Sequence, residues 1–182
     1  MDILLCGVGG QGTVLASKLL AKCAMNAGLP VRTAETIGMA QRGGCVLSHV
    51  RIGGEASAPL IPLGAADVLI AFEPAEGVRA LPYLKKGGAA VVNTRPLQAV
   101  TGNYDADEML TFLREHVENL TLADASAICE RCGNPRVLNM ALLGAAARAN
   151  ALGFTLEEVC TALTEILPER HVQVNLRAVR GE

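Results

Sequence analysis

The first twelve residues constrain the fold more than any other segment. A short apolar run over residues 1–5 leads into a turn in which Gly7, Gly9 and Gly12 have the G-x-G-x-x-G spacing. Between a strand and a helix, this spacing allows a tight turn, a close backbone approach to a pyrophosphate and close helix packing. The first N–H groups and the positive dipole end of the helix would face the anion. The segment predicts a phosphate-accepting turn, although such a turn can also serve only to pack a helix on a strand.

Alternating strand and helix patterns follow the turn. Apolar periodicity predicts strands at 31–34, 45–52, 58–62, 67–72, 89–93 and 120–123. It predicts helices at 13–27, 73–84, 108–117, 126–132, 135–150 and 156–167. The glycine pair at 87–88 would end the unit before the strand at 89–93. We therefore expect an α/β fold: a Rossmann-like, doubly wound, mostly parallel sheet with a helical C-terminal portion.

The length of 182 residues fits a single domain spanning 1–182, with a helical C-terminal part at about 124–167. Pro168 would end the last helix and leave a tail, 168–182, in which apolar and basic residues are mixed. Charged residues make up only 19% of the chain, against 51% hydrophobic residues, which indicates apolar surface covered by a partner. The tail is a candidate partner-binding arm.

Charge and hydropathy exclude several classes. The net charge is −2, and no Lys or Arg cluster interleaves with aromatic residues, so nucleic-acid binding is not expected. No apolar run is long enough to cross a bilayer, and the N-terminus lacks a basic segment followed by a cleavable apolar one. We expect a cytoplasmic protein with no membrane contact.

The six cysteines indicate reduced, small apolar side chains. Cys129 and Cys132 form the one C-x-x-C pair, a spacing used by redox motifs and by half of a metal site. No second pair or paired histidine would complete four ligands, so no metal site is expected.

Glu35 and the loop after it bear on the dinucleotide interpretation. Glu35 follows the expected strand 31–34, where a dinucleotide-binding domain places the acid that receives the ribose hydroxyls. The loop 36–44 is small, polar and glycine-rich, and Arg42 is its cation, which favours close approach to a ligand or partner over a plain surface loop. His49 is expected to be partly exposed on its strand, or to meet a ligand near this loop.

Two helix starts carry capping signals. Asn134 precedes Pro135, which suits the first helical position, and Thr155 with Glu158 forms a capping box.

Three motifs together resemble one family. They are Gly7-x-Gly9-Gly10-Gln11-Gly12, then Glu35-Thr36-x-Gly38-x-Ala40-Gln41-Arg42-Gly43-Gly44, then Gly133-Asn134-Pro135-Arg136-x-x-Asn139-x-x-x-Leu143-Gly144. The combination resembles the gamma-type domain of 2-oxoacid:ferredoxin oxidoreductases. The middle loop and the short chain are most similar to the beta subunit of indolepyruvate:ferredoxin oxidoreductases. The resemblance covers about residues 1–167 and leaves the tail outside.

The resemblance implies a function and partners. Such complexes decarboxylate an aryl 2-oxoacid on thiamine diphosphate, pass electrons through iron–sulfur clusters to ferredoxin, and yield an acyl-CoA. A separate large subunit would carry thiamine diphosphate, Mg²⁺ and the clusters, and this chain would form the coenzyme A side of a shared cleft in a hetero-oligomer. The isolated chain would be inert.

The resemblance also selects site residues. Gly7, Gly9, Gly10, Gln11 and Gly12 would form an anion-accepting turn at the interface. Thr36, Gln41 and Arg42 would reach the partner's active site, with Arg42 clamping a phosphate or carboxylate. Asn134, Arg136 and Asn139 would open a helix toward the same cleft, although Asn134 also fits a cap and Arg136 an interface salt bridge.

Two alternatives remain at this stage. One is an independent NAD(P)- or FAD-binding oxidoreductase, favoured by the glycine turn with Glu35. The other is a purely structural assembly subunit in which the turn holds no ligand.

Overall fold

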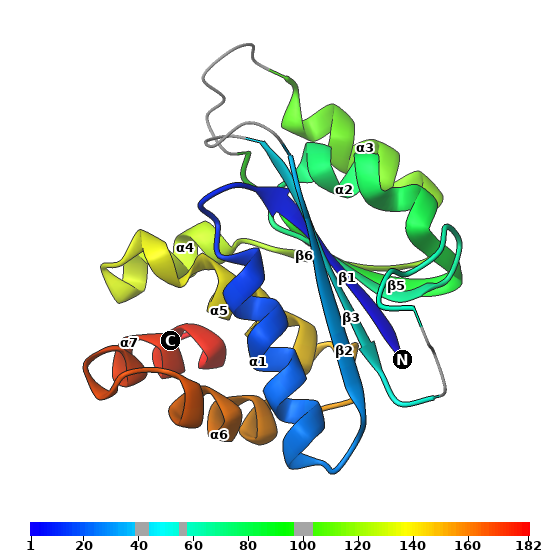
Figure 1. The fold of residues 1–182 in the computed structure, drawn as a ribbon. Helices are drawn as coiled ribbons and strands as arrows, with labels where there is room; N and C mark the ends of the chain where they lie inside the picture. Colours follow the sequence, from blue (N-terminus) through cyan, green and yellow to red (C-terminus); the bar gives the residue numbers. More distant parts are fainter. Residues whose placement is uncertain (39–43, 55–57, 97–103) are drawn as a thin grey trace.

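A six-stranded sheet organises the chain (Figure 1). The computed structural model describes residues 1–38, 44–54, 58–96 and 104–182. Its strands are β1 (Asp2–Val8), β2 (Val31–Ile37), β3 (Cys45–Ile52), β4 (Ala66–Ala71), β5 (Leu84–Asn93) and β6 (Asn119–Ala123), in the order β2-β3-β1-β4-β5-β6. Strands β1, β4, β5 and β6 are parallel, and β3 is antiparallel to both of its neighbours. The expected α/β class with a mostly parallel sheet is confirmed.

The position of β3 differs from a fully doubly wound sheet. It lies between β1 and β2, with Leu47 opposite Cys6 on one side and Thr36 on the other. The seven residues between β2 and β3 are too few for a crossover, and such short connections join antiparallel neighbours. The expected strand at 31–34 was too short, because β2 continues to Ile37, and no strand forms at 58–62.

Helices cover both faces of the sheet (Figure 1). They are α1 (Thr13–Asn26), α2 (Pro74–Ala80), α3 (Ala106–His116), α4 (Ala125–Cys132), α5 (Leu138–Arg148), α6 (Leu156–Ile166) and α7 (Glu169–Arg180), with 3₁₀ turns η1 (Leu81–Tyr83) and η2 (Pro135–Val137). Alternate strand residues point to opposite faces, so Leu5 packs in the core with α1 and α4–α7, while Leu4 packs in the core with α2 and α3. None of the described helices is long and apolar enough to cross a membrane.

Local signals set several element ends. The predicted capping box is confirmed: Glu158 N donates to Thr155 Oγ1 at 3.3 Å, and Thr155 N donates to Glu158 Oε2 at 2.7 Å. The predicted break at 87–88 is wrong, because Gly87 and Gly88 lie inside β5.

The C-terminal tail is a helix rather than a free arm. Helix α7 packs on α5 and α6, and its Ala178 and Val179 are fully buried. Arg148 Nη1 of α5 donates to Val179 O at 2.5 Å. The contact is close because Gly144 has no side chain: a Cβ there would lie 1.9 Å from Val179 O.

Candidate functional site

The carboxyl end of β1 is a topological switch point. Helix α1 leaves β1 over one face of the sheet, toward β2, while the next parallel strand, β4, lies on the other side of β1 and continues into α2 on the opposite face. In open α/β sheets, a crevice forms outside the strand ends where the connections diverge in this way, and ligands bind there.

A cavity of about 800 Å³ lies at this position. One wall is the turn after β1, and the other comes from α4, η2 and the start of α5, more than 110 residues later. The lining residues are Gly9, Gly10, Gln11, Gly12, Leu15, Ser126, Cys129, Glu130, Gly133, Asn134, Pro135, Arg136, Leu138 and Asn139. A volume of this size suits a cofactor or a similar small molecule.

The turn presents backbone rather than side chains. Gly10 and Gly12 have φ of +102° and +84°, a left-handed conformation that glycine adopts without strain. Gly12 precedes α1, and no side chain of the described residues caps that helix. Within the part of the chain that the structure describes, the first N–H groups of α1 therefore remain available beside the cavity, where the helix dipole favours an anion.

Gln11 stabilises the turn itself. Its Oε1 accepts a hydrogen bond from Val8 N at 2.8 Å, and its Nε2 donates to Phe72 O at 3.4 Å. Gly7 leaves room for this amide, since a Cβ there would lie 2.6 Å from Gln11 Oε1. Gly7 itself does not line the cavity.

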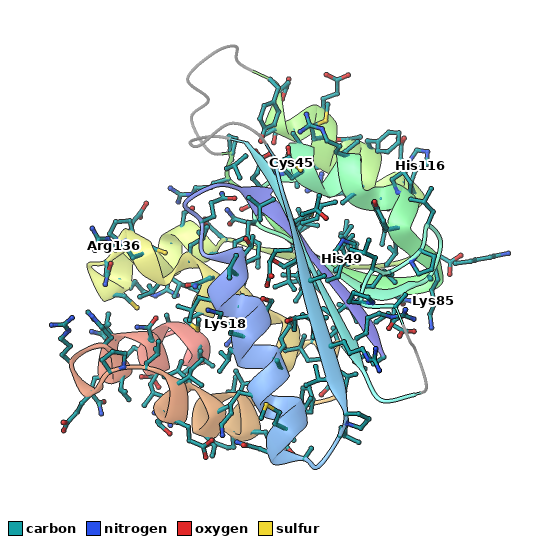
Figure 2. The ribbon with its side chains drawn as sticks, viewed as in Figure 1. Lys18, Cys45, His49, Lys85, His116 and Arg136 are labelled. Atoms are coloured by element: carbon teal, nitrogen blue, oxygen red, sulfur yellow. The ribbon has the colours of Figure 1, made fainter. Side chains whose placement is uncertain are left out.

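The opposite wall contains all three residues expected from the last motif. Asn134 Oδ1 accepts from Arg136 N at 3.0 Å and so caps η2. Asn139 is 2% exposed, and its Nδ2 donates to Gly12 O at 3.3 Å, which joins the two walls. Arg136 is exposed (Figure 2), and no described residue forms a hydrogen bond or ion pair with its guanidinium.

Glu35 and Thr36 lie away from the cavity. Glu35 lies within β2 rather than at its end, and its carboxylate accepts a hydrogen bond from Ser17 Oγ of α1 at 3.2 Å. Because β3 separates β2 from β1, the two strands are about 10 Å apart instead of adjacent. The expected position for a ribose-binding acid is therefore wrong. Gln41 and Arg42 lie outside the described residues.

Cys129 lines the cavity, whereas the sequence indicates only a reduced apolar side chain and a member of the C-x-x-C pair. It lies on α4 with its thiol 3.9 Å from Pro135 O, and burial raises its pKa to about 11. Four more lining residues are absent from the predicted site: Leu15, Ser126, Glu130 and Leu138. The sequence indicates them only through their positions on helices next to the glycine turn and the Asn134 motif.

His49 is buried in the sheet, so its expected partial exposure is wrong. It lies within β3 (Figure 2) and is 3% exposed. Its Nδ1 accepts from Ile61 N at 3.2 Å, and its ring meets Tyr83 edge-on. Burial lowers its pKa.

A second polar cluster lies on the α2 face, away from the cavity. Glu73 caps α2 by accepting from Glu76 N at 3.0 Å, and it also accepts from the Tyr104 hydroxyl. Glu76 is buried and pairs with Arg79, while its Oε2 has no hydrogen-bond partner among the described residues.

Sequence and structure comparisons place the chain among known proteins. The family model described as pyruvate ferredoxin/flavodoxin oxidoreductase matches residues 2–181, beyond the 1–167 covered by the motif resemblance. The indolepyruvate oxidoreductase subunit IorB of Archaeoglobus fulgidus is 41% identical over 99% of this chain and 92% of its own length.

Two solved structures share the fold. The pyruvate oxidoreductase subunit PORC of Thermotoga maritima has a TM-score of 0.71 and 25% identity, over 99% of this chain and 93% of that one. The 2-oxoglutarate:ferredoxin oxidoreductase of Magnetococcus marinus, solved with 2-oxoglutarate, coenzyme A and succinyl-CoA, has a TM-score of 0.70 and 22% identity. The match covers all of this chain and 30% of the Magnetococcus marinus chain. By sequence and fold, the chain belongs to the pyruvate ferredoxin/flavodoxin oxidoreductase family.

Proposed function

We propose that this chain is the small subunit of an indolepyruvate:ferredoxin oxidoreductase, a complex that oxidatively decarboxylates an aryl 2-oxoacid to an acyl-CoA. The observation that carries this proposal is the match to relatives named as indolepyruvate oxidoreductase subunits along almost the whole of both chains. Relatives named as common gamma subunits of pyruvate and ketoisovalerate oxidoreductases are less similar. The proposed substrate class follows the more similar group.

The cavity between the turn and η2 is the proposed coenzyme A side of the active site. Three features fit a phosphate-bearing ligand: the uncapped start of α1, the glycine backbone of the turn, and the Arg136 guanidinium. The apolar side chains of Leu15, Pro135 and Leu138 would cover less polar parts of the ligand. On this proposal the chain binds and orients the acceptor thiol, and the reacting groups come from elsewhere in the complex.

The remaining cofactors are assigned to a large partner subunit. In the described ranges, no three His, Cys, Asp or Glu side chains are grouped as a metal site would require. The proposal therefore gives thiamine diphosphate, Mg²⁺ and the iron–sulfur clusters to that partner, which would pass electrons to ferredoxin. We further propose that the two subunits form a hetero-oligomer in the cytoplasm.

Co-expression with the large subunit tests the proposal. The complex, and neither subunit alone, should reduce a viologen dye with indolepyruvate and coenzyme A. Arg136→Ala should raise the KM for coenzyme A roughly 10- to 100-fold, because a charge-assisted hydrogen bond contributes roughly 1.5–3 kcal/mol. Arg114→Ala is the matched control: Arg114 is exposed on α3, across the sheet from the cavity, and its loss should leave that KM unchanged.

Other outcomes would favour the alternatives. Tight NAD(H) binding and turnover by the isolated chain would replace the proposal with a dinucleotide-dependent enzyme, although the displaced Glu35 counts against it. If the Arg136→Ala complex kept full activity and the wild-type KM for coenzyme A, the result would favour a purely structural assembly subunit.

A further inference from the structure

One buried carbonyl joins the two walls of the cavity. Phe72 follows β4, is fully buried, and extends the parallel ladder through a hydrogen bond from its N to Cys6 O at 2.8 Å. Its carbonyl oxygen accepts from two amide side chains, Gln11 Nε2 at 3.4 Å and Asn93 Nδ2 at 3.2 Å. A carbonyl oxygen has two lone pairs, so both bonds form at once.

Gln11 connects this carbonyl to the glycine turn. Its amide lies over Gly7, with Oε1 held by Val8 N, so the turn cannot shift without disturbing the bond to Phe72 O. The backbone at 9–12 that lines the cavity is thereby tied to the end of β4.

Asn93 connects the same carbonyl to the opposite wall. It is 2% exposed at the end of β5, its Oδ1 accepts from Ala125 N at 3.2 Å, and its Nδ2 also donates to Arg95 O at 3.1 Å. Ala125 begins α4, which supplies Cys129 to the cavity. The amide orientation is fixed, because the reverse would place Oδ1 against two carbonyl oxygens.

We propose that Asn93 is a positioning residue for the cavity: through Phe72 O it sets the separation between the glycine turn and α4. No lining atom comes from Asn93 itself. The position requires an amide, since it must donate twice and accept once within a buried space. A carboxylate would present acceptors to two carbonyl oxygens, and an apolar side chain would leave Ala125 N and Phe72 O without these partners.

Asn93→Asp isolates the donor function, because it preserves shape and the acceptor for Ala125 N. This test rests on the proposed function for its ligand. In the co-expressed complex above pH 7, the KM for coenzyme A should rise about tenfold while the KM for indolepyruvate is unchanged. At lower pH the introduced carboxyl gains a proton and can donate to Phe72 O, so the KM for coenzyme A should recover in part. A merely structural role would lower the stability of the complex without this selective rise in the KM for coenzyme A.

Asn119→Asp is the matched control. Asn119 Nδ2 donates to Gly87 O at 3.0 Å, at the opposite end of the sheet, so the same chemical change occurs away from the cavity. This variant should keep the wild-type KM. If the Asn93→Asp complex does not assemble, Asn93→Ala removes the donor to Phe72 O without adding a charge, and the same rise in KM is expected.

Hydrogen exchange of the complex separates this inference from the proposed function. Asn93→Asp should speed amide exchange in the turn at 9–12 by at least tenfold, although the Asn93 side chain bonds to Phe72, Arg95 and Ala125 and not to the turn. Faster exchange in a complex whose activity does not depend on coenzyme A would overturn the proposed ligand and keep the positioning role. Unchanged exchange in the turn, with an unchanged KM, would overturn the positioning role.

Discussion

Replacing Gly144 by alanine tests the contact between α5 and α7. A Cβ at this position would lie 1.9 Å from Val179 O, 2.6 Å from Val179 C and 2.8 Å from its Cα. These are backbone atoms of α7, so no side-chain rotation relieves the clash. Helix α7 would have to move away from α5 by about 1 Å or more.

Two opposing effects set the change in the free energy of unfolding on Gly144→Ala. Alanine is favoured over glycine in a helix interior by about 1 kcal/mol, so propensity alone predicts a more stable protein. Displacement of α7 partly exposes Val179, whose burial is worth roughly 1.5–3 kcal/mol. It also weakens the hydrogen bond from Arg148 Nη1 to Val179 O, and hydrogen bonds to charged groups contribute roughly 1.5–3 kcal/mol. Because the displacement is partial, we expect a net loss of about 2 kcal/mol.

Thermal and urea denaturation of the purified chain measure this loss. A decrease of about 2 kcal/mol corresponds to a Tm lower by roughly 4–8 °C for a chain of this size. Gly77→Ala is the matched control, because Gly77 lies in helix α2 and a Cβ there would be 3.1 Å from the Ala71 side chain. Its change in stability should stay within about 1 kcal/mol. A Gly144→Ala protein as stable as wild type would refute the close approach of α7 to α5.

Three further predictions concern single side chains. Gly12→Ala should lower the free energy of unfolding by about 2–3 kcal/mol, because its φ is +84° and a Cβ would lie 2.6 Å from Asn139 Nδ2. Gly10 has a φ of +102°, and no atom of the described residues lies within 4 Å of a Cβ there, so Gly10→Ala should cost less than half as much in denaturant titrations. Burial lowers the pKa of His49 below 6.5, so the unfolded chain binds a proton at this site at higher pH than the folded chain, and wild-type stability should fall as the pH drops through 6.5. His49→Gln should reduce the dependence of the free energy of unfolding on pH between 7.5 and 5.5, and an unchanged dependence would contradict the buried neutral ring. Because burial raises the pKa of Cys129 to about 11, iodoacetamide at pH 8 should label it over tenfold more slowly than free cysteine, as peptide mass spectrometry would measure, and equal rates would contradict its burial.

Features set by neighbouring residues could be predicted from the sequence. The capping box of Thr155 and Glu158 depends on residues three positions apart, and the cap at Asn134 on residues two apart. Such bonds form wherever the local backbone turns into a helix, so they require no knowledge of the rest of the chain.

The neighbour of β1 could not be predicted from strand patterns alone. The alternation in β3 identifies a strand but does not say which strands it pairs with. A usable signal was present, because no helical pattern separates Ile37 from Cys45 and a parallel crossover needs one. An antiparallel β3 between β1 and β2 places Glu35 away from the glycine turn.

Helix α7 differs from the expected free tail, because that expectation treats Pro168 only as the end of a helix. Proline is also favoured at helix starts, and Val172, Leu176 and Val179 repeat at helical spacing after it. The docking itself depends on Gly144, which the motif resemblance included without a structural reason.

The chemistry of the cavity follows from which polar groups are already bonded. The amides of Gln11, Asn134 and Asn139 form hydrogen bonds within the protein, and Glu130 pairs with Arg95 at 2.9 Å. What remains on the described lining is mainly donor capacity: the first N–H groups of α1 and the guanidinium of Arg136. Ribose hydroxyls are recognised by a carboxylate acceptor, whereas phosphates are recognised by donors and positive charge. The bonding state of the side chains therefore favours a phosphate over a nicotinamide ribose, for a reason that the glycine spacing could not supply.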